Sequence, residues 1–282
     1  KELKMTVNDY QNYSYLPDEL QGVQSPNALE RIATNEKITR SSDDPALLAI
    51  SESLRANESG LTQSVQNVNS ALSYLEIGDS ALSEQSDILD SIKEKLLQAS
   101  TDTTNDEQRA NIKNEINDLI EQFDNIASNT DYNNQTILQN SIDDKSSSNE
   151  LQTQVGTNGE DLISTKSIQS NSEGLGLKEL LNDSNFTAQS AGAYLDTIDN
   201  AIDTVSSYRG DLGSTASQLE SSFTNLSSQV VNNSSALSTI SNVDYANEVS
   251  NFSKQNILAQ VGAFGHAQAN NINQQAVLRL LI

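Results

Sequence analysis

The chain of 282 residues has no cysteine and no tryptophan, only three prolines, and only 5% aromatic residues. Without cysteine it can form neither disulfides nor thiolate metal sites. Hydrophobic residues make up 35% of the chain, whereas globular proteins approach half, so a thick single core is excluded. Two possibilities remain: a disordered chain, or long helices that bury only narrow apolar stripes.

Basic residues are scarce as well. Lys and Arg number 16 against 39 Asp and Glu, and the formal net charge is −23. The chain therefore lacks the clustered Lys and Arg that bind nucleic acid phosphates or an anionic membrane surface. It also lacks a run of about 18 apolar residues that could span a bilayer, and its first residues lack the apolar core of a cleaved signal peptide. We expect neither nucleic acid nor membrane as a partner.

A strict heptad pattern in the first half decides against disorder. Every seventh residue over a span of eight heptad positions is apolar, which is typical of a helix that packs along a seam. Asp44 can cap this helix, and Pro45 occupies the favoured first helical position. The seam consists of Leu47, Leu54, Leu61, Val68, Leu75, Leu82, Leu89 and Leu96.

Three further segments follow. After a break at residues 100–105, Thr104 and Glu107 have the spacing of a capping box, and a shorter helix extends to about Asn129. Residues 131–186 lose the helical period; residues 151–155 alternate as a half-exposed strand does, Ile163 and Ile168 are candidates for a return strand, and Asn133-Asn134 and Asn158-Gly159 indicate turns. A second seamed helix, roughly 190–240, contains Leu212, Leu219 and Leu226.

These segments predict the fold class. Seamed helices cannot face water alone, so we expect a mainly α, elongated antiparallel helical rod, packed like a coiled coil, with a small β element at its turn-back end. We divide the chain into five parts: an N-terminal segment (1–42), the two halves of the rod (43–130 and 187–241), a short β and loop region between them (131–186), and a terminal helix (242–282).

Motifs at both ends resemble bacterial flagellin. Ala28-Leu29-Glu30-Arg31-Ile32 resembles the family's A-x-E-R-L, and Asn35 stands where the family has glycine, the other residue that tolerates a left-handed backbone. Gln154-Val155-Gly156-Thr157-Asn158 resembles Q-V-G-A-N. The C-terminal segments Arg209-Gly210-Asp211-Leu212-Gly213 and Asp244-Tyr245-Ala246-Asn247-Glu248-Val249 resemble R-x-x-L-G and D-Y-A-x-E-M. Residues 1–27 depart from the family pattern and carry Pro17 and Pro26, which puts a continuous N-terminal helix in doubt.

The resemblance implies a structural subunit that polymerises into the flagellar filament for motility. It implies no enzymatic activity, no cofactor and no metal. It also implies export without a cleaved signal peptide to the extracellular filament, and four kinds of partner: further copies of the chain, the flagellar export apparatus, an export chaperone, and the hook-associated and cap proteins. Two alternatives stay open: a hook–filament junction protein, which Asp43-Asp44-Pro45 favours, and a secreted flagellin-like protein that contacts a host without polymerising.

The terminal helix is the part expected to contact other subunits, because the rod leaves no free seam to cover it. We expect polymerisation contacts from Tyr245, Val249, Phe252, Ile257, Val261, Phe264, Leu278 and Leu281.

The resemblance also implies a face that a host Toll-like receptor reads. Where recognised flagellins have an Arg and a Leu on this face, the chain has Ser91 and Lys95, while Glu115 matches the family's downstream Glu. Because loss of an anchor residue weakens an interface strongly, we expect weak recognition by that receptor.

Overall fold

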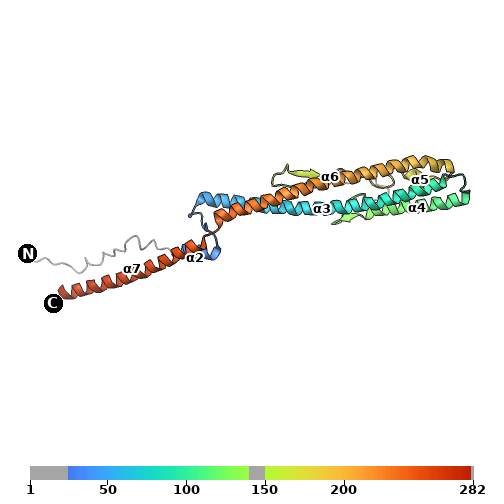
Figure 1. Ribbon diagram of the computed structural model, residues 1–282. Helices are drawn as coiled ribbons and strands as arrows, with labels where there is room; N and C mark the ends of the chain where they lie inside the picture. Colours follow the sequence, from blue (N-terminus) through green and yellow to red (C-terminus); the bar gives the residue numbers. More distant parts are fainter. Residues whose placement is uncertain (1–24, 140–149, 281–282) are drawn as a thin grey trace, which may run out of the picture. The chain divides into compact units, whose positions relative to one another are not determined.

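The computed structural model describes residues 25–139 and 150–280, and the fold there is mainly helical (Figure 1). The prediction of long helices with small antiparallel strand pairs is confirmed. The elements are α2 (Ser25–Thr34), α3 (Pro45–Ala99), α4 (Asp106–Asn129), β1 (Asp131–Tyr132), β2 (Gln135–Thr136), β3 (Gln152–Gln154), β4 (Leu162–Ser164), α5 (Lys178–Asn182), α6 (Ala188–Ser241) and α7 (Tyr245–Leu280).

The chain divides into two compact units. Residues 57–232 form one, which we name the rod unit. Residues up to 56 and from 233 onward form the other, the terminal unit. None of the helices in the described ranges is both long enough and apolar enough to span a bilayer.

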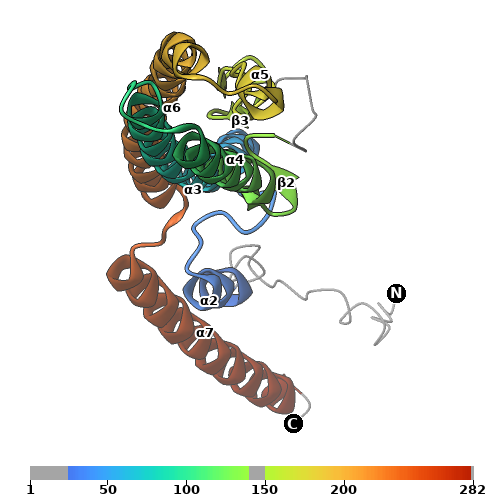
Figure 2. The same cartoon turned by 90° about the vertical axis from the view of Figure 1, so that its right-hand side faces the viewer.

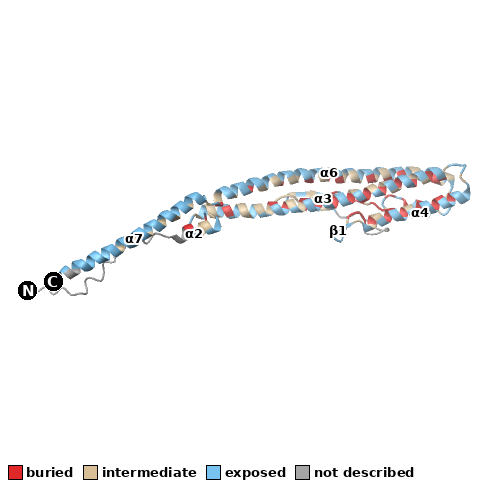
Figure 3. Cartoon of the chain, turned by 60° about the horizontal axis from the view of Figure 1, so that its bottom comes forward, coloured by how far each residue is buried: buried red, intermediate tan, exposed pale blue. Residues whose placement is uncertain are grey.

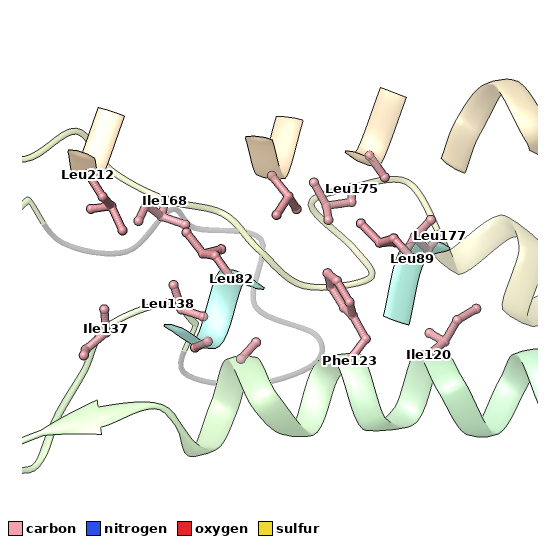
Figure 4. Packing of buried hydrophobic residues seen from close by; sticks show 14 of the residues in the cluster. Leu82, Leu89, Ile120, Phe123, Ile137, Leu138, Ile168, Leu175, Leu177 and Leu212 are labelled. Carbon is pink, nitrogen blue, oxygen red and sulfur yellow. The ribbon is translucent and has the colours of Figure 1, made fainter. Parts of the chain in front are cut away.

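The apolar core of the rod unit lies between α3, α4 and α6, and Figure 3 shows the buried residues along the facing sides of these helices. The seam residues from Leu61 to Leu96 are all buried. Figure 4 shows Phe123 and Ile120 of α4 pointing toward the space where Leu89 and Leu177 lie. The core also contains Ile112, Ile116, Ile198, Val205, Leu212, Leu219 and Leu226.

Polar side chains also hold the rod unit together. Gln85, fully buried on α3, donates from Nε2 to the carbonyls of Phe123 and Ser170, each at 3.1 Å. Asp124 on α4 accepts from the Ser172 N–H at 2.7 Å and from its Oγ at 2.6 Å. These bonds fasten the segment 168–177, which we name the strap, across α3 and α4. A buried polar group is tolerated because a hydrogen-bond partner replaces the lost water.

The helix ends show one confirmed cap and one wrong prediction. Asp44 Oδ1 accepts from the N–H groups of Ala46 and Leu47, both at 3.0 Å, so it caps α3 as predicted. The capping box of α4 lies one residue later than predicted, because Asn105 and Gln108 form it reciprocally. Thr104 lies one residue before the N-cap, since α4 begins at Asp106, and its hydroxyl donates to the carbonyl of Gln98 at the end of α3.

The two strand pairs are short antiparallel hairpins. Asn133 and Asn134 both have positive φ, at 52° and 64°, as a tight two-residue hairpin turn requires. Thr153 pairs with Ile163, whereas Ile168 is a buried residue outside the strands. The short helix α5 was not expected from the sequence.

The position of the β3–β4 hairpin differs from the expectation of a β element at the turn-back end. Ser64 Oγ on α3 donates to the carbonyl of Gly156 at 3.2 Å, and Asn67 Nδ2 donates to that of Gln154 at 3.3 Å. A Cβ added at Gly60 would come within 2.9 Å of Thr157, so this close approach uses a glycine on α3. The hairpin therefore packs along the side of α3, more than 30 residues before that helix ends at Ala99.

Candidate assembly surface

In the terminal unit, α2 packs against the start of α7 (Figure 2). Tyr245 donates from its hydroxyl to the carbonyl of Ile32 at 2.9 Å, and Arg31 Nε lies 3.4 Å from Glu248 Oε1. Asn35 has a φ of 59°, the left-handed conformation that the sequence predicted for this position. The turn it makes lets Lys37 donate its N–H to the carbonyl of Ser241 at 2.7 Å.

Helix α7 is much longer than the helix that covers it. At about 1.5 Å per residue, the 10 residues of α2 extend about 15 Å and the 36 residues of α7 about 54 Å. A half-buried stripe consists of Glu248, Phe252, Gln255, Ala259, Gly262 and His266.

Five large apolar residues of α7 lie away from this stripe and are exposed. With 3.6 residues per turn, they share a sector about 120° wide. Phe264 is 78% exposed and Val261 is 61% exposed, although such side chains are normally buried. We name this sector the outer face; it consists of Ile257, Leu258, Val261, Phe264 and Ile272.

The expected polymerisation residues fall into three groups. Ile257, Val261 and Phe264 are on the outer face, and Tyr245 and Val249 are exposed elsewhere on α7. Phe252 is half-buried in the stripe. The side chain of Leu278 and the whole of Leu281 lie outside the described residues.

Sequence reasoning missed two members of the outer face, Leu258 and Ile272. The apolar residues of α7 are spread over more than one side of the helix, so no single heptad frame selects them. The sequence signal that could have found Leu258 is its place beside Ile257 and three residues before Val261. Together these apolar residues cover a wider arc of the helix than a single seam does.

The seam residues lie in both units. Leu47 and Leu54 are half-buried in the terminal unit, and the carbonyl of Leu54 accepts a hydrogen bond from Asn233 Nδ2 at 2.7 Å. The other six are buried in the rod unit, as are Leu212, Leu219 and Leu226.

The receptor-face residues occupy neighbouring positions on α3 and α4. Ser91 is exposed and its hydroxyl donates to the carbonyl of Asp87 in its own helix, at 2.9 Å. Lys95 of α3 forms an ion pair with Glu115 of α4. The hydrogen bond to Glu115 raises the pKa of Lys95, and the charge of Glu115 adds to the effect. The structure therefore brings Lys95 and Glu115 into contact, with the carboxylate already paired.

The arrangement offers recognition surfaces. In the ranges 25–139 and 150–280, no group of three His, Asp or Glu residues could hold a metal ion. What the terminal unit presents is an apolar face on a long helix, and such faces are typical of protein–protein contacts.

Comparisons with known proteins agree on one protein family. Two family models match: the bacterial flagellin N-terminal helical region over residues 18–143 and the bacterial flagellin C-terminal helical region over residues 195–281. A flagellin of Halalkalibacterium halodurans is 34% identical, covering 92% of each chain. A flagellin of Bacillus subtilis is 33% identical over 90% of this chain and 91% of its own. The flagellar filament 31.3 kDa core protein of Treponema maltophilum is 29% identical over 90% of this chain and 91% of its own.

Two solved structures share the fold. A crystal structure of Bacillus cereus flagellin has a TM-score of 0.50 and 24% identity, covering 61% of this chain and 94% of that chain. The structure of a putative flagellar hook-associated protein from Vibrio parahaemolyticus has a TM-score of 0.60 and 14% identity, covering 71% of this chain and all of that chain.

Proposed function

This chain belongs to the bacterial flagellin family and is a structural subunit of the flagellar filament, and we propose that it polymerises through the outer face of α7. The observation that carries the proposal is the exposure of Ile257, Leu258, Val261, Phe264 and Ile272 on a helix that α2 is too short to cover. The family is a structural one, and its members form the extracellular filament.

The driving force for assembly would be burial of this face. Moving one large apolar side chain out of water stabilises by about 1.5–3 kcal/mol, so several together can offset the translational and rotational entropy that subunits lose on association. In this proposal residues 1–42 and 242–282 supply the layer between subunits. Residues 43–130 and 187–241 form the rod, and 131–186 are its short variable part.

Electron microscopy of the purified protein tests the proposal. Under polymerising conditions the full chain should form filaments, while a chain that lacks residues 250–282 should stay a soluble helical monomer. Filaments from the truncated chain would show that α7 is dispensable. A short ring or no assembly from the full chain would favour the junction protein or the non-polymerising protein instead.

An unassembled subunit with an exposed apolar face needs protection, because such faces aggregate. We propose that an export chaperone covers α7 before export, and that the chain leaves through the flagellar export apparatus without a cleaved signal peptide. Hook-associated and cap proteins would then contact the filament ends. Co-elution of a chaperone with the full chain, and its loss when residues 250–282 are removed, would support the first of these steps.

We also propose weak recognition by the host Toll-like receptor. Ser91 offers no Arg anchor, and the ion pair with Lys95 engages the carboxylate of Glu115. Loss of one anchor commonly costs about 2 kcal/mol, roughly thirtyfold in affinity. In a cell reporter assay the monomer should be much less potent than a recognised flagellin, and Ser91→Arg with Lys95→Leu should raise its potency. Equal potency of the unchanged monomer would contradict this.

A further inference from the structure

The loop between β3 and β4 is built around the carboxylate of Asp161. Its Oδ2 accepts from the backbone N–H of Asn158 at 3.2 Å and from Asn158 Nδ2 at 3.1 Å. The N–H of Asp161 donates to the carbonyl of Asn158 at 3.0 Å. Gln154 Nε2 also donates to that carbonyl. The amide side chain of Asn158 is thus exposed and donates a hydrogen bond to the neighbouring carboxylate of Asp161.

The backbone conformation at the next residue, Gly159, does not require a glycine. Its φ lies outside the left-handed region, and a Cβ added there would meet no atom within 4 Å. Among the described residues, the Gly159 N–H makes none of the hydrogen bonds that hold the loop. Without a Cβ at position 159, the peptide nitrogen beside the Asn158 side chain is sterically unshielded.

We propose that Asn158 is a site of spontaneous deamidation, and that its product loosens the β3–β4 loop from α3. The Gly159 nitrogen, after losing its proton, attacks Cγ of Asn158. A bond forms between them, and Nδ2 takes a proton and leaves as ammonia. Water then opens the five-membered imide at either carbonyl, giving aspartate or an isoaspartyl linkage. The reaction consumes one water and releases one ammonia, and it profits from the proximity of groups adjacent in the chain.

Deamidation replaces the hydrogen-bond donor of the Asn158 amide with a negatively charged carboxylate. An aspartate at position 158 would face Asp161 Oδ2 across the 3.1 Å now bridged by the amide, and like charges repel. An isoaspartyl linkage adds a carbon to the backbone and displaces the carbonyl that Gln154 and Asp161 share. Both changes act on the loop that Ser64 and Asn67 hold against α3.

Ageing of the purified full chain tests the chemical step. After incubation at 37 °C and mildly alkaline pH, peptide mapping by mass spectrometry should find a gain of about 1 Da on the peptide that contains Asn158, partly as isoaspartate. Asn158→Gln, which needs a larger ring, and Gly159→Ala, which the loop accommodates, should lower modification at this position to the level of Asn225 on α6. Equal modification of Asn158 and Asn225, or an unchanged rate in Gly159→Ala, would overturn the proposal.

Hydrogen exchange tests the consequence. Residues 154–161 should exchange faster in Asn158→Asp than in Asn158→Gln, which keeps the amide donor. High salt should narrow the difference, because it screens exposed charges. Equal exchange rates in the two variants at low salt would contradict the proposed loosening of the β3–β4 loop.

Discussion

Helices α4 and α7 carry apolar residues at similar three- and four-residue spacings, but only α4 buries them inside its own chain. Ile116, Ile120 and Phe123 of α4 are fully buried. Ile257 of α7 is 60% exposed, and Phe264 more so. The two helices differ in what the described residues place beside them: α4 packs against α3 and the strap, whereas α7 packs against the short α2.

This difference separates two uses of an apolar helix. In the rod unit, apolar burial and buried hydrogen bonds stabilise a single subunit. On α7, the same kind of residue is exposed, and in our proposal it contacts other subunits. Substitutions in the rod unit should therefore change the stability of the monomer, and substitutions on the outer face should change assembly.

The largest expected effect is that of a charge in the seam. Leu75 is 3% exposed, so Leu75→Asp would bury an unpaired carboxylate and should cost about 3–5 kcal/mol of unfolding free energy. Circular dichroism should show lost helix or a much lower melting temperature. Ile77→Asp, two residues away at 38% exposure, should melt close to the unchanged protein. An equal loss in both variants would contradict the frame of the seam.

A smaller effect is expected where the strap meets α4. Asp124→Leu removes the acceptor of the Ser172 N–H and Oγ, and an unsatisfied buried donor costs about 1–3 kcal/mol. Urea unfolding of the monomer should show this loss. Asp118→Leu changes an exposed carboxylate on the same helix and should leave the midpoint nearly unchanged. If both variants unfold alike, the strap does not stabilise the rod unit.

The smallest effect depends on pH. Burial raises the pKa of Tyr74 above its usual value near 10, so the folded state holds this proton more tightly than the unfolded state. Stability from Tyr74 is present below pH 10 and is lost as pH rises through its folded pKa. The unfolding free energy of the unchanged protein should fall more between pH 9 and 11 than that of Tyr74→Phe. Parallel curves would contradict the burial of this hydroxyl.

Sequence patterns predicted the long helices well, because the heptad recurrence reports directly on a buried face. The Asp44 cap and the left-handed Asn35 could be predicted because each depends on local chemistry. The residue at which a helix begins was harder to predict. The N-cap of α4 is Asn105, one residue after the predicted Thr104, whose hydroxyl donates to the carbonyl of Gln98.

The candidate surface was predicted only in part. Sequence reasoning found Ile257, Val261 and Phe264 but could not tell that Phe252 lies in the half-buried stripe, because burial along α7 depends on tertiary packing. The strap was missed for a similar reason. Ser170 and Ser172 look like loop residues until Gln85 and Asp124, more than 40 positions away, supply their partners.

A matched pair of substitutions on α7 tests most directly whether the outer face drives assembly. Phe264→Asp places a charge on the outer face, whereas Asn270→Asp places the same charge at an exposed polar position on the opposite side of the same helix. Both monomers should keep the melting temperature and helix content of the unchanged protein, and only Phe264→Asp should fail to form filaments under the electron microscope. Normal filaments from Phe264→Asp, or a monomer destabilised as strongly as Leu75→Asp, would contradict that role of the outer face.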